Sequence, residues 1–429
     1  VTYNSAVQTN SGASYSGQQG SDSFTISGYA KGTNAGTYTD SLSLTTLNGN
    51  GLSNYEVSYM QGHLIINPAV INAQALNISG SKVYDGNATF TATHLSLSGI
   101  LTADSGQVSL DGSATVASHN VGTYTNWASN SLSLTGSAST NYTLTGGAVS
   151  VSINKANATV TANSGTKTYN GLTQSVTGFT ATGLVNGETS TVLAGVTTSG
   201  GSGKNAGTYA LTASGTDQNY NLSFVNGALT INQASLTVTG ANTTLTYNGA
   251  TQTNAVATVI GQQGSDSFTI SGYASGTNAA TYTDNLSVSG SALSNYVVTY
   301  NNGSLVIGKA NLTIIGNTRS VTYNAGSQTN TYSTSGLVGS DSVSSVTGLA
   351  SGTNYSATAY ADNLIAVIGS GLDNYTISYV NGSLTINKAS LTVTGADNTV
   401  TYNSTEQTNS GASYSGQQGS DSFSISGYA

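Results

Sequence analysis

Short runs of alternating apolar and polar residues recur along the chain. Three of them are Leu236-Thr-Val238, Leu312-Thr-Ile314 and Leu391-Thr-Val393. A period of two predicts strands with one buried and one exposed face. No window of the sequence shows a sustained 3.6-residue apolar period, so we expect an all-β protein.

A second pattern surrounds the Asn-Gly pairs. The run before Asn381-Gly382 carries Tyr375, Ile377 and Tyr379, and the run after it carries Leu384 and Ile386. The same design spans residues 220–231 and 296–307. Because a type I′ turn requires positive φ at both central residues, Asn-Gly between alternating runs predicts a β-hairpin.

Three short motifs repeat in a fixed order. A Tyr-Asn or Tyr-Asp pair recurs every 76 to 85 residues, beginning at Tyr3, Tyr84, Tyr169, Tyr247, Tyr323 and Tyr402. An Asn-Ala-Gly-Thr-Tyr segment or a variant of it occupies 34–38, 120–124, 205–209 and 278–282, and a longer form occupies 354–360. An Asn-Tyr pair ends at Tyr55, Tyr142, Tyr220, Tyr296 and Tyr375. The period exceeds that of a solenoid and favours small independent β-domains.

The repeats divide the chain into modules. We predict a partial module at 1–67, full modules at 68–154, 155–232, 233–308 and 309–387, and a partial module at 388–429. Each boundary carries Ile-Asn-Lys-Ala or a relative of it, with almost no linker. Short strands and short connections predict β-sandwich-like modules joined end to end into an extended rod.

A longer repeat spans five modules. Residues 1–30 and 400–429 differ at three positions only, which are Ala6/Thr405, Val7/Glu406 and Thr25/Ser424. We expect the chain to be part of a longer mature protein.

Composition excludes several classes of protein. Only 6% of residues are charged, against about 25% in typical soluble domains, and the net charge is −8. Without clusters of Lys and Arg we expect no nucleic acid partner, and without an apolar run of about 20 residues we expect no membrane insertion in this segment. Cysteine is absent, which excludes disulfides and thiolate metal sites.

One acidic residue recurs in the middle of each module, at Asp22, Asp104, Glu188, Asp266, Asp341 and Asp421. It is either one carboxylate of a calcium site or a turn residue that accepts hydrogen bonds from nearby backbone N–H groups. A second acid, which could approach the first, is found at Asp40, Asp284 and Asp362 but not in 155–232. No Asp-x-Asp-x-Asp run exists, so we favour the turn and predict no metal site and no cofactor.

The remaining candidates have plain structural interpretations. His63, His94 and His119 occur in two modules only, and we expect His63 to be exposed. Lys155, Lys309 and Lys388 lie at module boundaries, where solvated side chains are favoured over a Lys–Asn isopeptide crosslink. Tyr220, Tyr296 and Tyr375 repeat in phase and are expected in the core, although carbohydrate stacking is the alternative. We predict no catalytic residue, because paired carboxylates are hard to assemble from so few acids.

The segment from Leu236-Thr-Val-Thr-Gly through Leu245-Thr-Tyr-Asn-Gly to Asn-Tyr and Gly-x-Leu-x-Ile resembles the mostly-β glycine-rich (MBG) modules of bacterial surface adhesins. Residues 82–86 and 121–124 make the second module, 68–154, similar to the related YDG module. The resemblance covers essentially the whole chain, and it implies MBG-like modules at 155–232, 233–308 and 309–387 and partial ones at 1–67 and 388–429. The resemblance implies a large secreted protein of the filamentous haemagglutinin-like, two-partner-secretion type from a Gram-negative bacterium.

Two functional hypotheses follow. The first is a structural stalk or fibre segment of an adhesin or extracellular filament, serving cell adhesion or a biofilm matrix, with copies of itself or a neighbouring cell surface as partners. The alternative is a repeat-borne surface that binds exopolysaccharide, which a repeating row of exposed aromatic residues would favour. Near-duplicate modules argue against an enzyme.

Overall fold

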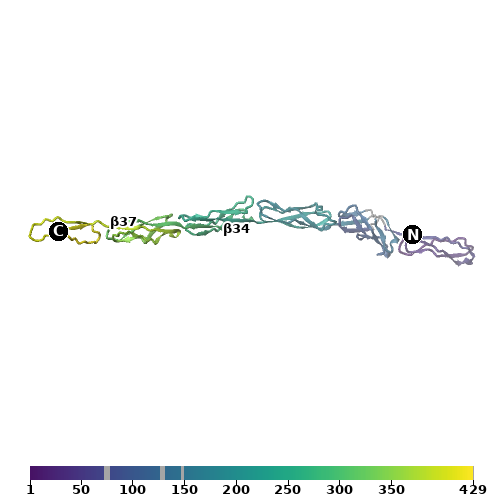
Figure 1. Cartoon of the computed structure of the whole chain (residues 1–429). Coiled ribbons are helices and arrows are strands. Elements are labelled where there is room, and N and C mark those ends of the chain that lie inside the picture. The colour runs from purple at the N-terminus through teal and green to yellow at the C-terminus, as the bar shows by residue number, and fades with distance from the viewer. Residues whose placement is uncertain (72–77, 126–130, 146–148, 429) are drawn as a thin grey trace. The chain divides into compact units, whose positions relative to one another are not determined.

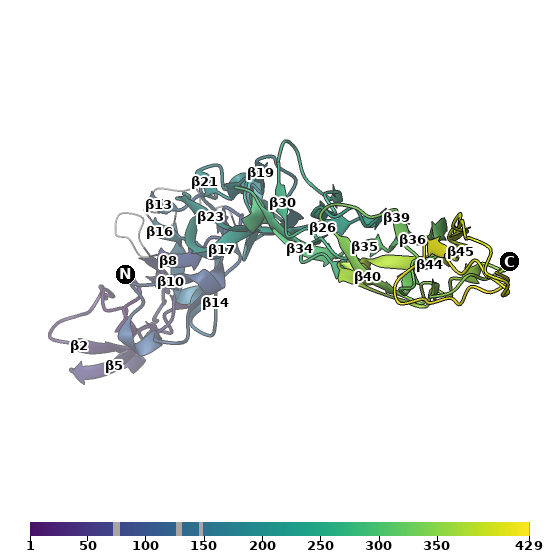
Figure 2. The same cartoon turned by 90° about the vertical axis from the view of Figure 1, so that its left-hand side faces the viewer.

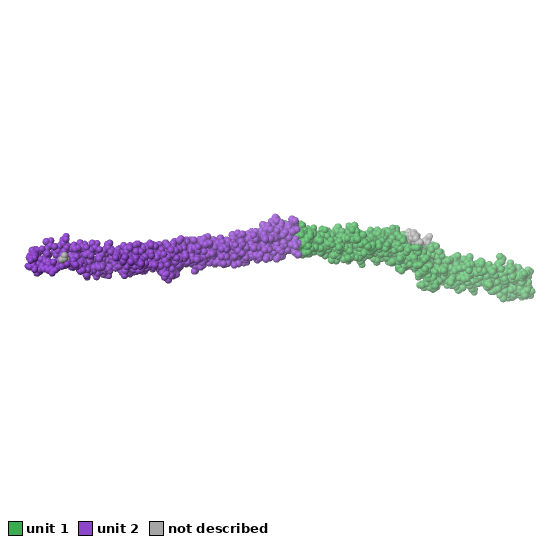
Figure 3. Space-filling view, viewed as in Figure 1, with its two compact units in different colours: residues 1–167, 173–231 green, residues 168–172, 232–429 purple. Residues whose placement is uncertain are grey.

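The computed structural model describes residues 1–71, 78–125, 131–145 and 149–428. Within these ranges the regular structure consists of short β-strands and three-residue 3-10 turns, which confirms the predicted all-β class (Figure 1). The chain forms two compact units, residues 1–167 with 173–231 and residues 168–172 with 232–429 (Figure 3). None of the helical turns in the described ranges is long and apolar enough to span a membrane.

Residues 233–308 show the arrangement of one module. Its strands are β26 (Ala234–Gly240), β27 (Asn242–Thr246), β28 (Gln252–Thr253), β29 (Ala257–Ile260), β30 (Thr269–Ser271), β31 (Ser275–Gly276), β32 (Thr281–Thr283), β33 (Ser287–Ser289), β34 (Tyr296–Asn301) and β35 (Ser304–Gly308). They form two three-stranded sheets, in the orders β29-β26-β34 and β27-β35-β32, and two smaller pairs, β28-β31 and β30-β33.

Two segments of the chain connect the two three-stranded sheets. Strand β26 pairs in parallel with β34, and β27 pairs in parallel with β35. Only Ala241 separates β26 from β27, and only two residues separate β34 from β35, so both segments pass from one sheet to the other. Figure 2 labels β34 beside β26, its partner in the first of these sheets. The alternating residues Leu236 and Val238 of β26 are fully buried, as the sequence pattern predicts.

The hairpin predicted at each Asn-Gly pair is wrong. Strand β44 (Tyr375–Val380) pairs with β36 (Ala310–Gly316), whereas β45 (Ser383–Asn387) pairs with β37 (Thr318–Thr322) and β42 (Tyr360–Ala361), in another sheet. Gly382 does not have positive φ. It is needed because a Cβ there would lie 2.3 Å from the carbonyl oxygen of Gly316 on the neighbouring crossing segment.

The same order of strands recurs elsewhere. Residues 309–387 add β38 (Gln328–Thr329), β39 (Tyr332–Ser335), β40 (Ser342–Thr347), β41 (Ser351–Gly352) and β43 (Ala366–Ser370). Residues 155–232 hold β17 (Ala156–Ala162), β18 (Gly165–Thr168), β19 (Gln174–Ser175), β20 (Phe179–Thr182), β21 (Val196–Gly200), β22 (Ser202–Gly203), β23 (Gly207–Gly215), β24 (Tyr220–Val225) and β25 (Gly227–Asn232). Parallel pairs β17-β24 and β36-β44 correspond to β26-β34.

Residues 68–154 hold β7 (Ala69–Ile71), β8 (Ile78–Val83), β9 (Thr89–Thr91), β10 (Leu95–Leu97), β11 (Ser109–Asp111), β12 (Ser113–Thr115), β13 (Gly122–Thr125), β14 (Ser133–Thr135), β15 (Tyr142–Leu144) and β16 (Val149–Asn154). Residues 1–67 hold β1 (Gln8–Thr9), β2 (Ser23–Ser27), β3 (Lys31–Gly32), β4 (Gly36–Thr39), β5 (Ser43–Asn48) and β6 (His63–Ile66). The last residues hold β46 (Thr392–Thr394) and β47 (Ser413–Ser415). Among the described strands, each pairing joins strands of one predicted module.

Candidate functional site

Two hydrogen bonds stabilise the turn that the Tyr-Asn motif forms. The backbone N–H of Tyr247 donates to the Gly308 carbonyl at 2.8 Å, and the N–H of Ala250 donates to the Asn248 side chain at 3.0 Å. The second bond is an Asx turn, which requires Asn or Asp at that position. Equivalent bonds fasten the turns that follow Tyr3, Tyr169 and Tyr323. The motif therefore places a tyrosine in a defined position at the end of a module.

That tyrosine meets the recurring acid of the following module. The hydroxyls of Tyr247 and Tyr375 both donate to Oδ2 of Asp341, at 2.7 and 2.8 Å. Their rings pack edge to face with centroids 5.5 Å apart. The N–H of Val338 donates to the Tyr375 hydroxyl at 2.9 Å, so that hydroxyl both accepts and donates. We call this arrangement of one carboxylate between two tyrosines the tyrosine clamp.

The tyrosine clamp occurs four times in the described residues. Asp104 accepts from Tyr3 at 2.8 Å and from Tyr142 at 2.6 Å, and Asp266 accepts from Tyr169 at 2.9 Å and from Tyr296 at 2.6 Å. Glu188 accepts from Tyr84 at 2.6 Å through one oxygen and from Tyr220 through the other. Two acids have one tyrosine each, with Asp22 bound to Tyr55 at 2.6 Å and Asp421 bound to Tyr323 at 2.8 Å.

The asparagine of the Asn-Tyr motif adds a second contact beside the clamp. The backbone N–H of Ala279 donates to Asn374 Oδ1 at 2.7 Å, and Asn374 Nδ2 donates to the side chain of Asn278 at 3.4 Å. Ala35 donates to Asn141 at 2.8 Å and Val121 donates to Asn219 at 2.9 Å in the same way. All three sequence motifs therefore meet where successive modules join.

Burial and the carboxylate keep the clamp tyrosines protonated. Burial, with the hydrogen bond to Asp104, raises the pKa of Tyr142 to about 12. Burial and Asp266 raise the pKa of Tyr296 to about 12, and the bond to Asp341 followed by burial does the same for Tyr247. Ionisation of a hydroxyl would place a second negative charge against the carboxylate, so the neutral donor is favoured.

The recurring acids lie in turns, as predicted, but their hydrogen-bond partners differ from the prediction. The N–H of Asp266 donates to Gln263 O at 3.1 Å and that of Asp341 to Val338 O at 3.3 Å, which places both acids in turns. Their carboxylates, however, bind tyrosine hydroxyls from distant parts of the sequence. Among the described residues, no group of three His, Asp or Glu side chains gathers as metal ligands do.

The second recurring acid, at Asp40, Asp284 and Asp362, is buried. Asp284 is 2% exposed and binds the Nδ2 of buried Asn254 through both oxygens, at 3.2 and 3.1 Å. It also accepts the N–H groups of Ala274 at 2.7 Å and Gly303 at 3.0 Å. Gly303 lies in the crossing between β34 and β35. The second acid therefore holds the sheet crossing and binds asparagine, instead of approaching the first acid.

The buried Asn–Asp pair is repeated in one other module and replaced by two apolar residues in a third. Asn330 and Asp362 repeat it, with bonds of 3.0 and 2.9 Å. In residues 155–232 the equivalent positions hold Val176 and Leu211, so both partners are apolar together. Thr243 donates to Asn254 Oδ1 at 2.8 Å, but Arg319 stands at the equivalent position. Asn330 Oδ1 is accordingly a buried acceptor without a partner.

The YDG motif contains a buried cation that sequence reasoning missed. Lys82 is 5% exposed, and its Nζ donates to both oxygens of Asp85 at 2.9 and 3.1 Å, to Asn87 O at 2.7 Å and to Thr89 O at 2.8 Å. Burial raises the pKa of Asp85, but the bonds from Lys82 and the Asn87 N–H outweigh it and lower the pKa below its usual value. An isolated lysine three residues before an acid could have suggested this pair.

The other predicted residues are placed as follows. His63, His94 and His119 are exposed, and so are Lys155, Lys309 and Lys388. Lys155 donates to Asp217 O at 2.6 Å, and Lys388 lies 4.8 Å from the ring centroid of Tyr355. An isopeptide bond requires a buried lysine, so the solvated interpretation holds. Tyr220, Tyr296 and Tyr375 are buried, as expected.

Comparison with known families gives two matches. Residues 67–150 match the YDG domain, and residues 158–230 match the MBG domain of the YGX type. No curated protein matches the chain. Among solved structures, the N-terminal eight Ig domains of Down syndrome cell adhesion molecule align at 11% identity over 88% of this chain and 64% of that one, with a TM-score of 0.17. Sidekick-1 immunoglobulin domains 1–5 align at 9% identity over 82% and 86%, with a TM-score of 0.20.

The resemblance drawn from the sequence motifs is confirmed for these two segments. The chain therefore contains a YDG domain at residues 67–150 followed by an MBG domain of the YGX type at residues 158–230.

Proposed function

We propose that the chain is a structural segment of the stalk of an extracellular adhesin or filament. The observation that carries this proposal is the recurrence of the tyrosine clamp between consecutive sequence repeats. A stalk must hold its modules in a fixed relation, and a clamp supplies two charge-assisted hydrogen bonds and a ring contact at four of the five joints in the described residues. The YDG and MBG domains support the assignment to a repeat protein of this kind.

The absence of cysteine and the repetition of one kind of module suit the same role. A chain without cysteine forms no wrong disulfides during export, and repeats of one kind extend a stalk without requiring a unique active site. The proposal places the protein outside the cell, with the surface of another cell or further copies of the chain as partners.

Immunogold electron microscopy tests the location and form. Antibodies raised against residues 155–232 should label filaments that project from the surface of intact cells. Label that appears only after the cells are permeabilised, or that decorates compact particles, would contradict the proposal.

A second candidate, binding of exopolysaccharide, is favoured by one observation. The fourth residue after the Asn-Tyr tyrosine is aromatic in four modules, at Tyr59, Phe224, Tyr300 and Tyr379, and these side chains are 36% to 41% exposed. Phe224, Tyr300 and Tyr379 lie on the edge strands β24, β34 and β44. Exposed aromatic faces that recur once per repeat can stack on the sugar rings of a polysaccharide.

Binding of purified exopolysaccharide distinguishes the two candidates. If the row binds sugar, replacing Phe224, Tyr300 and Tyr379 by alanine should abolish retention of the chain on immobilised polysaccharide. Tyr402→Ala removes an aromatic side chain that is 88% exposed but lies outside the row, and it serves as the control. Equal retention of both variants would leave the stalk as the sole role.

A further inference from the structure

The first and last segments of a full module lie side by side. In residues 233–308, six residue pairs join β26 to β34 and five join β27 to β35, and both pairings are parallel. The paired region starts at Ala234, the first residue of β26, and ends at Gly308, the last residue of β35. We call these two parallel pairings the terminal ladder. It joins the two points at which the chain enters and leaves the module.

Tension along the chain loads the terminal ladder in shear. It pulls Ala234 towards the N-terminus and Gly308 towards the C-terminus, and because the paired strands are parallel, the two pulls act along the strands in opposite directions. The evenly spaced hydrogen bonds of a parallel pair then carry the load together. Peeling the strands apart from one end would load the bonds one after another. Since forced unfolding is governed by the unfolding rate, the shear direction should give the slower unfolding at a given force.

Buried side chains oppose sliding of the terminal ladder. Leu236 and Val238 on β26 are fully buried, and Leu305 and Ile307 on β35 are at most 2% exposed. A slip of one residue would turn the alternate side chains of a strand to its other face. The apolar side chains would then leave the core for water. Sliding therefore costs apolar burial as well as hydrogen bonds.

The buried Asn–Asp pair holds the middle of the terminal ladder, where it passes between the two sheets. Asn254 Nδ2 donates to the carbonyl oxygen of Ala241 at 2.7 Å, and Asp284 accepts the N–H of Gly303 at 3.0 Å. Ala241 separates β26 from β27, and Gly303 lies between β34 and β35. Both segments of the crossing are therefore bound to the same pair of side chains.

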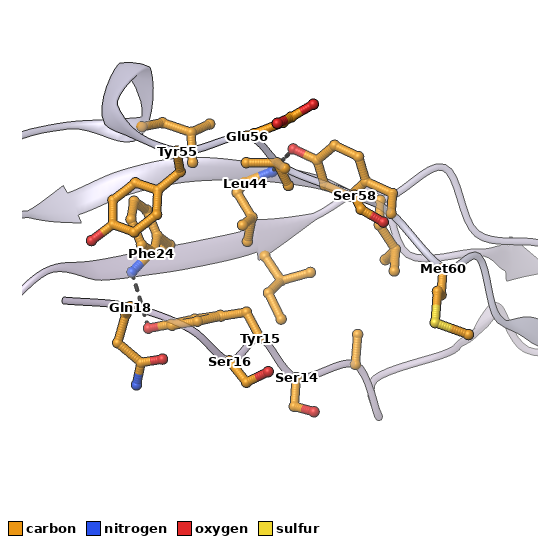
Figure 4. Close-up of a pocket in the computed structure, with 16 residues that line it drawn as sticks. Ser14, Tyr15, Ser16, Gln18, Phe24, Leu44, Tyr55, Glu56, Ser58 and Met60 are labelled. Atoms are coloured by element: carbon orange, nitrogen blue, oxygen red, sulfur yellow. Dashed lines mark hydrogen bonds between the residues drawn. The ribbon is translucent and has the colours of Figure 1, made fainter.

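The smaller strand pairs of a module do not lie on the path of the tension. The pair β30-β33 reaches β34 through a side chain, since the N–H of Val288 donates to the hydroxyl of Tyr300 at 3.3 Å. Figure 4 shows a contact of the same kind in residues 1–67, where the N–H of Phe24 on β2 donates to the hydroxyl of Tyr15 at 3.0 Å. Strands β28 to β33 lie in the chain between the two halves of the terminal ladder. Tension therefore reaches them only after the ladder has opened.

The terminal ladder recurs in the other full modules. In residues 309–387, six pairs join β36 to β44 and five join β37 to β45, again in parallel. In residues 155–232, six parallel pairs join β17 to β24. In residues 68–154, three parallel pairs join β7 to β15 and six join β8 to β16. The ladder is thus common to the YDG domain and the MBG domain, and it persists in 155–232 without the Asn–Asp pair.

We propose that the terminal ladder bears tension, so that each full module resists a force that pulls on the two ends of the chain. This inference deepens the stalk function and rests on it for its use in the cell, because a stalk between two surfaces is pulled at its ends. The mechanical strength itself follows from the direction of the strands and does not depend on where the protein is located.

Pulling one module in two directions tests the proposal, with the whole chain held in optical tweezers. The chain has no cysteine of its own, so engineered cysteines fix the points of attachment. Gln233→Cys with Lys309→Cys loads the terminal ladder in shear. The matched control, Gln233→Cys with Ser294→Cys, pulls at the neighbouring starts of β26 and β34 and peels the same ladder open. At equal loading rate, we expect the first pair to unfold the module at about twice the force of the second or more.

The two chains differ in the direction of the pull and share the folded module. All three replaced side chains are exposed, so both chains should keep the free energy of unfolding of the unmodified protein. Equal unfolding forces for the two pairs of attachment points, or a lower force in shear, would overturn the proposal. A failure of the stalk function shows instead in the immunogold labelling and leaves this ratio of forces unchanged, so the two failures are distinguishable.

Discussion

The hydroxyl of Tyr3 donates a 2.8 Å hydrogen bond to the carboxylate of Asp104, which lies 101 residues further along the chain. Tyr142, from the same module as Asp104, donates to the same carboxylate oxygen. Buried carboxylates are costly unless their lone pairs are satisfied, so each partner in the clamp depends on the others.

The clamp at Asp341 should show this dependence directly. Tyr247→Phe removes one of two donors and should lower the free energy of unfolding by about 1 to 2 kcal/mol, because the bond is charge-assisted. Asp341→Ala leaves two hydroxyls without an acceptor and should cost more. In the Asp341→Ala background, Tyr247→Phe should cost almost nothing. Denaturant unfolding of the four proteins checks this cycle, and additive losses would contradict the clamp.

Alkaline pH should weaken the joints before it weakens the rest of the fold. The folded-state pKa values of Tyr142, Tyr220, Tyr247 and Tyr296 are about 12, above the usual value of about 10. The stabilisation is complete below pH 10 and is lost as pH rises from 10 towards 12. The slope is at most about 1.4 kcal/mol per pH unit for each tyrosine, and solvent near the hydroxyl reduces it. Denaturant titrations at several pH values measure this slope. Replacing these four tyrosines by phenylalanine should flatten it, and an unchanged slope would assign the effect to other groups.

The unpaired acceptor in residues 309–387 offers a stabilising substitution. Arg319→Thr should supply Asn330 Oδ1 with the hydroxyl donor that Thr243 gives to Asn254, and should raise the free energy of unfolding by about 1 kcal/mol. The reciprocal change Thr243→Arg should destabilise its own module by a similar amount. Calorimetry measures whether Arg319→Thr raises and Thr243→Arg lowers the free energy of unfolding. A loss of stability in Arg319→Thr would show that the orphaned oxygen is not the cause.

The buried Asn–Asp pair should be replaceable only as a pair. Asn254→Val alone should cost about 2 kcal/mol or more, because Asp284 loses a donor inside the core. Adding Asp284→Leu recreates the Val176 and Leu211 combination of residues 155–232 and should recover at least about 1 kcal/mol. Urea unfolding of the single and double variants measures this coupling. Equal or greater loss in the double variant would contradict it.

The strands could be predicted from the sequence, and their connections could not. The alternation at Leu236 and Val238 gives the buried face of β26 correctly. Around Asn381-Gly382, however, a hairpin and a crossing between sheets produce the same alternation. What separates them is the space at Gly382, which is closed by the backbone of Gly316, 66 residues earlier in the chain. Local sequence does not contain that long-range contact.

The tyrosine clamp, too, could be predicted from the sequence only in part. The sequence locates its three members, because the Tyr-Asn tyrosine, the acid and the Asn-Tyr tyrosine each recur once per repeat in one order. Their meeting was missed because Tyr84 and Glu188 belong to different modules, and a turn offers the acid a sufficient local explanation. Recurrence of a lone acid in step with two tyrosines was the signal that could have joined them.

Small-angle scattering of the whole chain tests the central claim, that clamps hold successive modules end to end in a stiff stalk. A module that advances by one strand of about ten residues adds roughly 35 Å, so the account predicts a maximum dimension on the order of 200 Å with a rod-like cross-section. A compact particle of this length would have a radius of gyration of about 22 Å. That compact result, or a broad distance distribution without a rod-like cross-section, would contradict the account.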